Sequence, residues 1–294
     1  MELISEYREY LKKEKDMSDN SLSAYSRDIR DFLNFLKGKG TGNPCEASNT
    51  EVVSYLLTLK NQGRSGATIN RKVAAIRAFY TWLMSRGMVR ENPTANIKSP
   101  KIQRKEIEYL TIDEVEMILA QPDHTPKGIR DRALLELLYA AGLRVSEAAA
   151  ADIRDINLRI GFITCDGRYG KARIIPLGKP AQKALEEYIY DGRAKLLREH
   201  EDGGALFLNY YGERLTRQGV WKVMKEYGRK AGIRRELSPQ ILRNSFAVHM
   251  IQNGADLKTM QELLGHEDIS ATQIYLSVTK NRIKEVYDNA HPRA

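Results

Sequence analysis

The chain has 294 residues, 42% of them hydrophobic, which is enough for one large domain or two ordinary ones with real cores. Its formal charge of +9 favours a polyanionic partner such as nucleic acid, although many basic proteins bind none. Two distant cysteines, Cys45 and Cys165, exclude a disulfide framework and suggest no zinc site, and no stretch is as long and apolar as a membrane span. Because the charged start also lacks an apolar signal core, we expect a cytoplasmic protein.

Apolar residues recur at helical spacing in four segments between residue 2 and about residue 87. This pattern predicts an all-helical first domain over residues 1–91, with breaks at 18–20, 38–44 and 63–66, where capping and turn-forming residues gather. Residues 92–107 follow, with two prolines, several lysines and arginines and little periodicity. They are predicted to form an extended basic linker.

A second domain is expected over residues 108–294, where Thr111 can cap a first helix and a strongly amphipathic helix ends at Gly142. Residues 161–177 carry β-branched residues on either side of a glycine-rich centre, which predicts a β-hairpin. The rest should be mostly helical, with stops near Gly232, Gly254 and Gly265. The expected fold class is therefore mainly α with a small β-hairpin or sheet in the second domain.

Three stretches of the second domain form an ordered set of motifs. They are AAGLRVSEAAAADI around Arg144, LSPQILRNSFAVHMIQNGADL around Arg243, and LLGHEDISATQIYLSV, which carries His266 and Tyr275. Together they resemble the signature boxes of the tyrosine recombinases, and the resemblance to the Xer type extends over nearly the whole chain. It implies a two-domain, site-specific DNA recombinase that requires neither a metal nor another cofactor.

The chemistry implied by the resemblance needs these residue types. Attack on a phosphodiester builds negative charge on the non-bridging oxygens, and the guanidiniums of Arg144 and Arg243 would meet that charge with forked hydrogen bonds. Tyr275 would attack the phosphate and form a 3'-phosphotyrosyl bond, releasing a 5'-hydroxyl that later serves for rejoining. His266 would donate a hydrogen bond to the phosphate or help to move protons.

The sequence departs from the family pattern at two positions. Gln240 stands three residues before Arg243, where the family has histidine or lysine, and glutamine cannot exchange a proton near neutral pH. Arg168 stands in the hairpin where the family has a lysine general acid, and arginine is a poor acid because its pKa exceeds about 12. We therefore take Lys171 as the candidate acid, with a plain phosphate contact as the alternative, and expect an active enzyme that is slow or partner-dependent.

The resemblance also implies how DNA is held. The two domains would clamp a duplex that carries an inverted-repeat core site, with four candidate DNA contacts: Arg71, Lys72, Lys101 and Arg104. A solvated helix face is the alternative for the first two. Four protomers, identical or of two kinds, would assemble on two DNA sites, with the segment NRIKEVYDNA docking onto a neighbour. No membrane partner is expected. No nucleotide partner is expected either, because the fragment GKGTG at 38–42 lacks the spacing of a phosphate-binding loop.

Rival interpretations remain open. The chain could be an inactive, architectural family member, as Gln240 and Arg168 would allow, or a helical transcription regulator, which would leave the ordered motifs unexplained. A metal-dependent transposase is disfavoured, since no persuasive set of acidic motifs is present. The recombinase interpretation itself requires that both arginines face one site and that the phenol of Tyr275 is not locked in the interior. The DNA site, a chromosomal or mobile-element role and the need for a second recombinase are left open.

Overall fold

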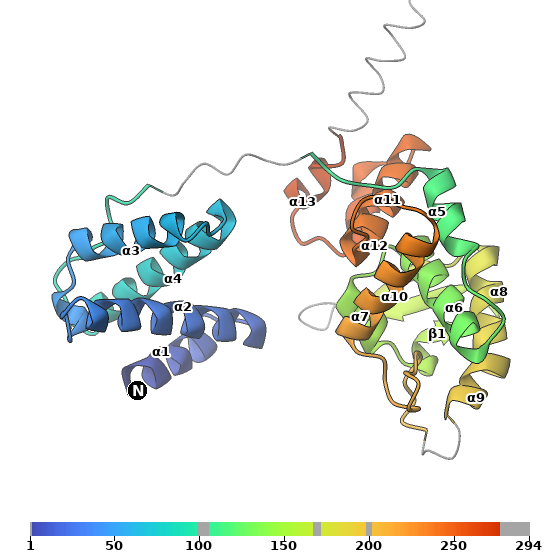
Figure 1. Ribbon diagram of the computed structural model, residues 1–294, viewed down its shortest axis with the longest axis horizontal. Helices are drawn as coiled ribbons and strands as arrows, with labels where there is room; N and C mark the ends of the chain where they lie inside the picture. The colour runs from blue at the N-terminus through green and yellow to red at the C-terminus, as the bar shows by residue number, and fades with distance from the viewer. Residues whose placement is uncertain (1, 99–105, 167–171, 198–201, 277–294) are drawn as a thin grey trace, which may run out of the picture. The chain divides into compact units, whose positions relative to one another are not determined.

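The computed structural model describes residues 2–98, 106–166, 172–197 and 202–276. The chain divides into two compact units, Met1–Lys105 and Glu106–Ala294, and the division falls within the predicted linker range. Figure 1 shows the helices and strands of the two units. Each unit has hydrophobic core clusters of its own. The expected fold class is confirmed, because helices dominate both units and the second unit adds one small sheet.

The first unit is built from helices whose starts are set by serine caps. Ser18 and Ser65 accept backbone N–H groups of α2 and α4, and Ser48 forms a reciprocal capping box with Glu51 at α3. The core is rich in aromatic rings, with Trp82 and Phe79 fully buried. The elements of this unit are α1 (Glu2–Lys13), α2 (Asp19–Gly38), the short 3-10 helix η1 (Pro44–Glu46), α3 (Asn49–Asn61) and α4 (Gly66–Ser85).

The predicted linker begins later than the sequence indicates. Residues 93–96 form turns rather than an extended strand. The side chain of Asn92 donates to the carbonyl of Arg77 on α4, and Arg77 in turn donates to the carbonyl of Ile97. Thr94 is fully buried. The expectation of an extended segment from residue 92 is therefore wrong for residues 92–97, since α4 binds them through side chains whose partners lie far away in the sequence.

The second unit is organised around α6, whose buried positions run through the middle of the largest core cluster. Helices α5, α8 and α11 all pack against it. The helices of this unit are α5 (Ile112–Leu119), α6 (Pro126–Ala141), α7 (Val145–Ala150), η2 (Ile153–Asp155), α8 (Lys179–Glu187), the π-helical η4 (Tyr188–Gly192), α9 (Arg193–Leu197), α10 (Arg217–Lys230), α11 (Pro239–Gln252), α12 (Leu257–Leu264) and α13 (Ser270–Gln273).

A three-stranded antiparallel sheet with order β1-β2-β3 lies in the second unit. Its strands are β1 (Ile156–Asn157), β2 (Phe162–Cys165) and β3 (Arg173–Pro176). The β2–β3 pair is the predicted hairpin, with Thr164 opposite Ile174. Ile163 and Ile175 face the core, and β3 contacts α12.

Glycines end the helices that frame the site. Gly142 and Gly265 adopt left-handed conformations, with φ of 55° and 60°, and close α6 and α12. Gly142 also has no room for a side chain, because a Cβ there would lie 2.3 Å from the ring of Phe246. Among the described residues no helix is long and apolar enough to cross a bilayer.

Candidate active site

Arg243, on α11, is almost fully buried, and its guanidinium is fixed by the ends of two other helices. It donates to the carbonyl of Gly142, which closes α6, and at 2.6 Å to the carbonyl of Leu264, the last residue of α12. Carbonyls at helix C-termini carry partial negative charge and stabilise a cation. Burial and the nearby Arg144 nevertheless lower the pKa of Arg243 to about 10. The site therefore holds a desolvated cation before any anion arrives.

Arg144 is aimed at the same place from the start of α7. One terminal nitrogen donates at 2.9 Å to the carbonyl of Gly265, which closes α12, and the other donates at 2.9 Å to Glu147. Its side chain is 41% exposed, so the guanidinium remains open to a ligand. Both predicted arginines are thus brought together, each bonded to the carbonyl of a left-handed glycine that ends a helix.

Glu147 supports this arrangement, although it is not among the site residues predicted from the sequence. Its carboxylate accepts hydrogen bonds from the backbone N–H and the guanidinium of Arg144. It also accepts two from Arg173 on β3, at 2.8 and 2.9 Å. Burial acts to raise the pKa of Glu147, but the bonds from Arg173 and Arg144 outweigh it and the pKa lies below its usual value. An ionised Glu147 therefore holds Arg144 in a fixed direction.

His266 contacts Arg243 through its imidazole. A guanidinium can only donate, so the 3.2 Å contact between Arg243 and Nε2 makes that nitrogen the acceptor. The hydrogen must then sit on Nδ1, which donates at 2.8 Å to the hydroxyl of buried Thr272. Burial, followed by the positive charges of Arg243 and Arg144, lowers the pKa of His266 to about 4. The imidazole is therefore neutral at physiological pH.

Tyr275 follows the short helix α13 and lies beside the same cations, but its ring is only 1% exposed. Its hydroxyl donates at 3.1 Å to the side-chain oxygen of Asn244 on α11. Burial raises the pKa of Tyr275, although Arg243 and Arg144 act in the opposite direction. The requirement for a phenol that is not enclosed in the interior is therefore not met in this structure, and a catalytic role for Tyr275 would require the side chain to move.

The remaining predicted catalytic residues lie away from this group or outside the described part of the chain. Gln240 is exposed on the first turn of α11, where its amide donates at 2.8 Å to Asn244. Arg168 and Lys171 both fall in 167–171, outside the described residues. The choice between these two as general acid therefore stays a prediction.

The structure separates the two candidate DNA contacts on α4. Lys72 is buried, and its ammonium lies 3.0 Å from Asp28 and 2.8 Å from Asp31. Burial lowers the pKa of Lys72, but the bonds to Asp31 and Asp28 outweigh it and raise the pKa overall. The expectation that Lys72 contacts DNA is corrected accordingly, because this lysine neutralises buried Asp28.

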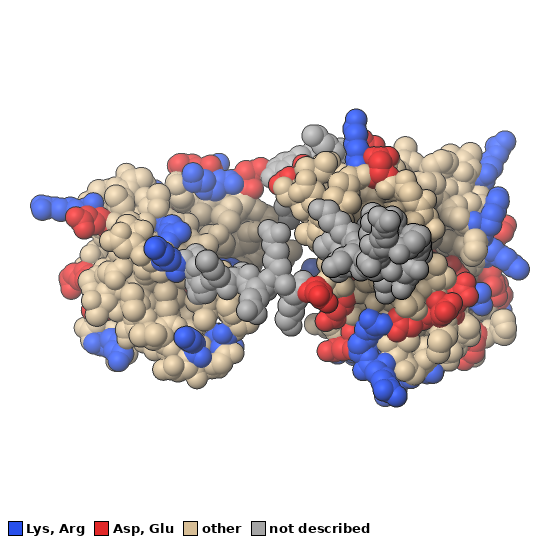
Figure 2. Space-filling model, turned by 90° about the horizontal axis from the view of Figure 1, so that it is seen from above, with Lys and Arg blue, Asp and Glu red and all other residues tan. Residues whose placement is uncertain are grey.

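Arg71 remains a candidate, since it contacts the same aspartate but is 42% exposed. Lys101 and Arg104 fall in 99–105, and the predicted docking segment falls in 277–294, so all three lie outside the described residues. On the face seen in Figure 2, basic and acidic side chains are interspersed over both units. Within the described parts of the chain, no group of three or more histidine, cysteine or acidic side chains is placed to hold a metal ion.

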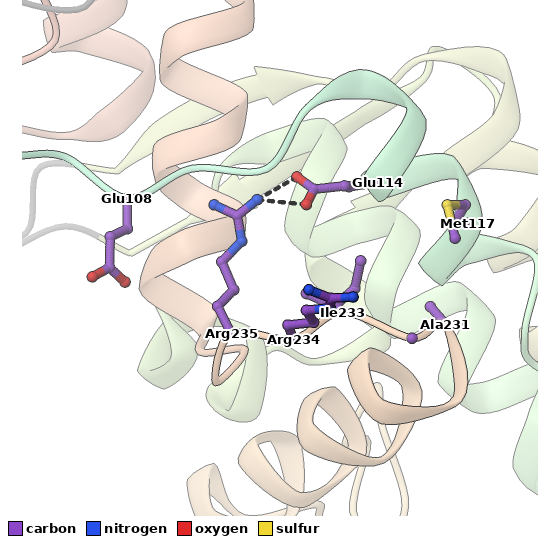
Figure 3. A pocket seen from close by; sticks show the side chains of 8 residues that line it. Glu108, Glu114, Met117, Ala231, Ile233, Arg234 and Arg235 are labelled. Atoms are coloured by element: carbon purple, nitrogen blue, oxygen red, sulfur yellow. Dashed lines mark hydrogen bonds and ion pairs between the residues drawn. The ribbon is translucent and has the colours of Figure 1, made fainter.

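A pocket of about 620 Å³ lies between α5 and the connection from α10 to α11 (Figure 3), and neither Arg144 nor Arg243 lines it. Arg235 crosses it to pair with both oxygens of Glu114 and also donates at 2.8 Å to the backbone carbonyl of Tyr109. The pocket contains none of the predicted catalytic residues.

Comparisons with known proteins cover almost the whole chain. Residues 108–282 match the phage integrase family, and residues 4–87 match the SAM-like N-terminal domain of phage integrases. The chain is 43% identical over 292 residues to the tyrosine recombinase XerD of Oceanobacillus iheyensis, covering 99% of this chain and 98% of that protein. It is 46% identical over 293 residues to a putative tyrosine recombinase of Caldanaerobacter subterraneus, covering 99% of each.

Solved structures share the fold at lower identity. XerH bound to a palindromic difH substrate in a post-cleavage complex matches with a TM-score of 0.77 and 23% identity, covering 96% of this chain and 83% of that one. A lambda integrase dimer bound to a COC' core site matches with a TM-score of 0.73 and 18% identity, covering 93% and 94%. At these identities the matches establish the architecture.

Proposed function

The chain belongs to the phage integrase family and is a site-specific tyrosine recombinase of the Xer type, and from this premise we propose that Tyr275 breaks and rejoins duplex DNA through a 3'-phosphotyrosyl bond. The observation that carries the proposal is the convergence of Arg144, Arg243 and His266, each held by bonds to the ends of helices or to buried side chains. Preorganised donors of this kind stabilise charge that develops on a phosphate during attack.

The reaction conserves the energy of the phosphodiester bond. The phenol oxygen of Tyr275 attacks the scissile phosphorus and the 5'-oxygen leaves as a hydroxyl, so one P–O bond forms as another breaks. The 5'-hydroxyl of a partner strand later attacks the phosphotyrosine and returns the phenol. Arg144 and Arg243 carry the charge of the phosphorane in both directions.

Proton transfer falls to His266 and to the hairpin. Gln240 cannot take up a proton, whereas neutral His266 offers an unprotonated Nε2 once Arg243 turns from the imidazole to the phosphate. His266 thus suits the acceptance of the phenol proton, and Lys171 is the proposed donor to the leaving 5'-oxygen. Loss of one such group costs about a hundred- to ten-thousandfold in rate, so replacement of the family residues by Gln240 and Arg168 slows the enzyme without abolishing cleavage.

DNA is the partner that these features imply. The first unit, proposed as residues 1–91, and the catalytic unit, proposed as residues 108–294, bind one duplex through its phosphates, and four protomers act on two inverted-repeat core sites. The reaction takes place in the cytoplasm. An inactive architectural role is less well supported, because a protein that only binds DNA has no need for a neutral imidazole and two fixed guanidiniums around one position.

A nicked suicide substrate tests the proposal, because loss of a short strand beyond the nick prevents rejoining and traps the covalent protein–DNA adduct. Wild type is expected to accumulate adduct and Tyr275→Phe none, while both bind the site equally. Resistance of cleavage to EDTA would separate this chemistry from that of a metal-dependent nuclease. Equal adduct from wild type and Tyr275→Phe would remove Tyr275 from the catalytic role.

A further inference from the structure

The first residues of the second unit, here called the lead-in segment (Glu106–Leu110), are attached along α11 by side chains. Asn244 donates at 2.9 Å to the carbonyl of Glu108, and Ser245 accepts the N–H of Leu110 at 2.8 Å. Arg235 also donates to the carbonyl of Tyr109, and Figure 3 shows Glu108 on this stretch of backbone and the side chain of Arg235 reaching towards it from the connection between α10 and α11. Because the first unit ends at Lys105, the lead-in segment is the part of the second unit to which the first unit is covalently joined, and a force transmitted along the backbone would act on it first.

Asn244 also holds the nucleophile. Its side-chain oxygen accepts from the phenol of Tyr275 at 3.1 Å and from the amide of Gln240 at 2.8 Å. The orientation of the Asn244 amide follows from its third partner, since the carbonyl of Glu108 can only accept and must face the NH₂ group. One amide therefore joins the lead-in segment, the start of α11 and the resting phenol.

Packing connects the same parts. The buried ring of Tyr275 belongs to a hydrophobic cluster with Phe246, Met260 and Leu264, and two lead-in residues, Ile107 and Tyr109, pack against that cluster. A shift of the lead-in segment would thus disturb both the apolar surroundings of the ring and the amide that holds its hydroxyl. A hydrogen bond of 3.1 Å is already at the long end of the normal range, and a further displacement of about 1 Å breaks it.

We propose that Asn244 is a positioning residue that keeps Tyr275 in its resting place and ties its release to movement of the lead-in segment. The inference rests on the proposed function and adds a control point to it. While the amide bridges Glu108 and Tyr275, the phenol stays buried and away from DNA. When DNA binding displaces the lead-in segment, the amide turns with the Glu108 carbonyl and the phenol loses its acceptor.

Three variants separate this role from simple support of the fold. Asn244→Ala removes all three side-chain bonds, to Glu108, Gln240 and Tyr275. Asn244→Asp keeps an acceptor for the phenol but cannot donate to the carbonyl of Glu108. Ser245→Ala is the matched control, because it removes the neighbouring bond to Leu110 and leaves Asn244 in place. DNA affinity equal to that of wild type verifies folding, and Asn244→Leu, of similar volume, replaces Asn244→Ala if that variant does not fold.

Nitration of the full-length, DNA-free protein by tetranitromethane measures how often the phenol is released. The modification rate at Tyr275, read by peptide mass spectrometry, should rise about two- to tenfold in Asn244→Ala, the range that one neutral hydrogen bond is worth. Asn244→Asp should match wild type, and Ser245→Ala, which loosens the lead-in segment but leaves the bond to the phenol, should show a smaller rise than Asn244→Ala. The exposed Tyr211 gives the internal reference. An unchanged rate in Asn244→Ala, or an equal rise in Ser245→Ala, would overturn the proposal.

Cleavage supplies the readout that a purely supportive residue would not give. At saturating nicked substrate, adduct formation should be about two- to tenfold faster in Asn244→Ala and slower by a similar factor in Asn244→Asp, which holds the phenol but no longer follows the lead-in segment. Support of the fold alone predicts that both variants are impaired, and that result would contradict the coupling. If wild type formed no adduct, the proposed function would fail, while nitration would still decide whether Asn244 holds Tyr275.

Discussion

At the scale of single residues, the site depends on groups that carry no chemistry themselves. The carbonyls of Gly142 and Gly265 fix one guanidinium each, and Glu147 and Thr272 orient Arg144 and His266. Each contact occupies an N–H group of Arg144, Arg243 or His266 and so fixes the direction in which the rest of that side chain points. Groups of the protein itself thus fix the directions of Arg144, Arg243 and His266, whereas the proposed role of Tyr275 requires that residue to move.

His266 predicts a specific pH dependence of stability. The pKa of His266 in the folded protein is about 4, below the value of about 6.5 for an exposed histidine, so the unfolded chain takes up this proton first as the pH falls. The contribution of neutral His266 to the free energy of unfolding is complete above about pH 6.5 and is lost as the pH falls towards 4. In urea unfolding at pH 7 and pH 5, wild type should lose more stability than His266→Gln. Equal losses would contradict the predicted pKa.

Lys72 and Arg71 should differ although they are neighbours in the sequence. Lys72→Ala leaves Asp28 without its buried partner, which we expect to lower the free energy of unfolding by about 3 kcal/mol, as for a broken buried ion pair. Arg71→Ala should cost much less stability, because that side chain is partly exposed. Thermal unfolding and DNA binding, measured on both variants, test this. Normal stability with weakened DNA binding in Lys72→Ala would restore it as a DNA contact.

At the scale of elements, the C-terminal ends of α6 and α12 position Arg243 and Arg144. Substitution of the glycines at helix ends therefore tests this arrangement. Gly142→Ala combines a left-handed conformation with a Cβ 2.3 Å from Phe246, so unfolding should become easier by about 2 kcal/mol or more. Gly254→Ala is the control, since φ there is 96° but nothing lies within 4 Å, and about 1 kcal/mol is expected. Denaturant unfolding gives both values. Equal costs would show that the Phe246 contact is unimportant.

Sequence patterns predicted the elements where local signals are strong. Serine and threonine caps and the glycine stops gave the helix ends in both units, and β-branched residues gave the β2–β3 hairpin. The strand β1 was missed because two residues carry no periodicity. Lys72 was misjudged because its partners lie on another helix, and residues 92–97 were misjudged because their bonds reach back to α4.

The same distinction applies to the site. The resemblance supplied Arg144, Arg243, His266 and Tyr275, and the structure brings the first three into direct or shared contacts. Residues that hold them come from far away in the sequence, as when Arg173 on β3 bonds Glu147 on α7. Only the tertiary fold creates such pairs. The sequence left the burial of Tyr275 open, since an amphipathic pattern does not distinguish a resting nucleophile from a core tyrosine.

At the scale of the whole molecule, the chain has a formal charge of +9 and two units, which we propose bind one DNA duplex. Affinity dominated by phosphate contacts should fall steeply with salt, by about a thousandfold or more between 50 and 200 mM if six or more contacts form. Fluorescence anisotropy with a core-site duplex measures this dependence. Arg71→Ala should lower the slope of log Kd against log salt by about one. A loss of less than tenfold over that range would show that phosphates contribute little.

The central claim is that the phenol of Tyr275 becomes the covalent link to DNA. The most direct measurement is mass spectrometry of the tryptic peptide that remains attached to a cleaved suicide substrate. We expect the peptide from Thr259 to Lys280, carrying a nucleotide joined through its 3'-phosphate to Tyr275. DNA attached to any other residue, or cleavage without a covalent protein adduct, would contradict it.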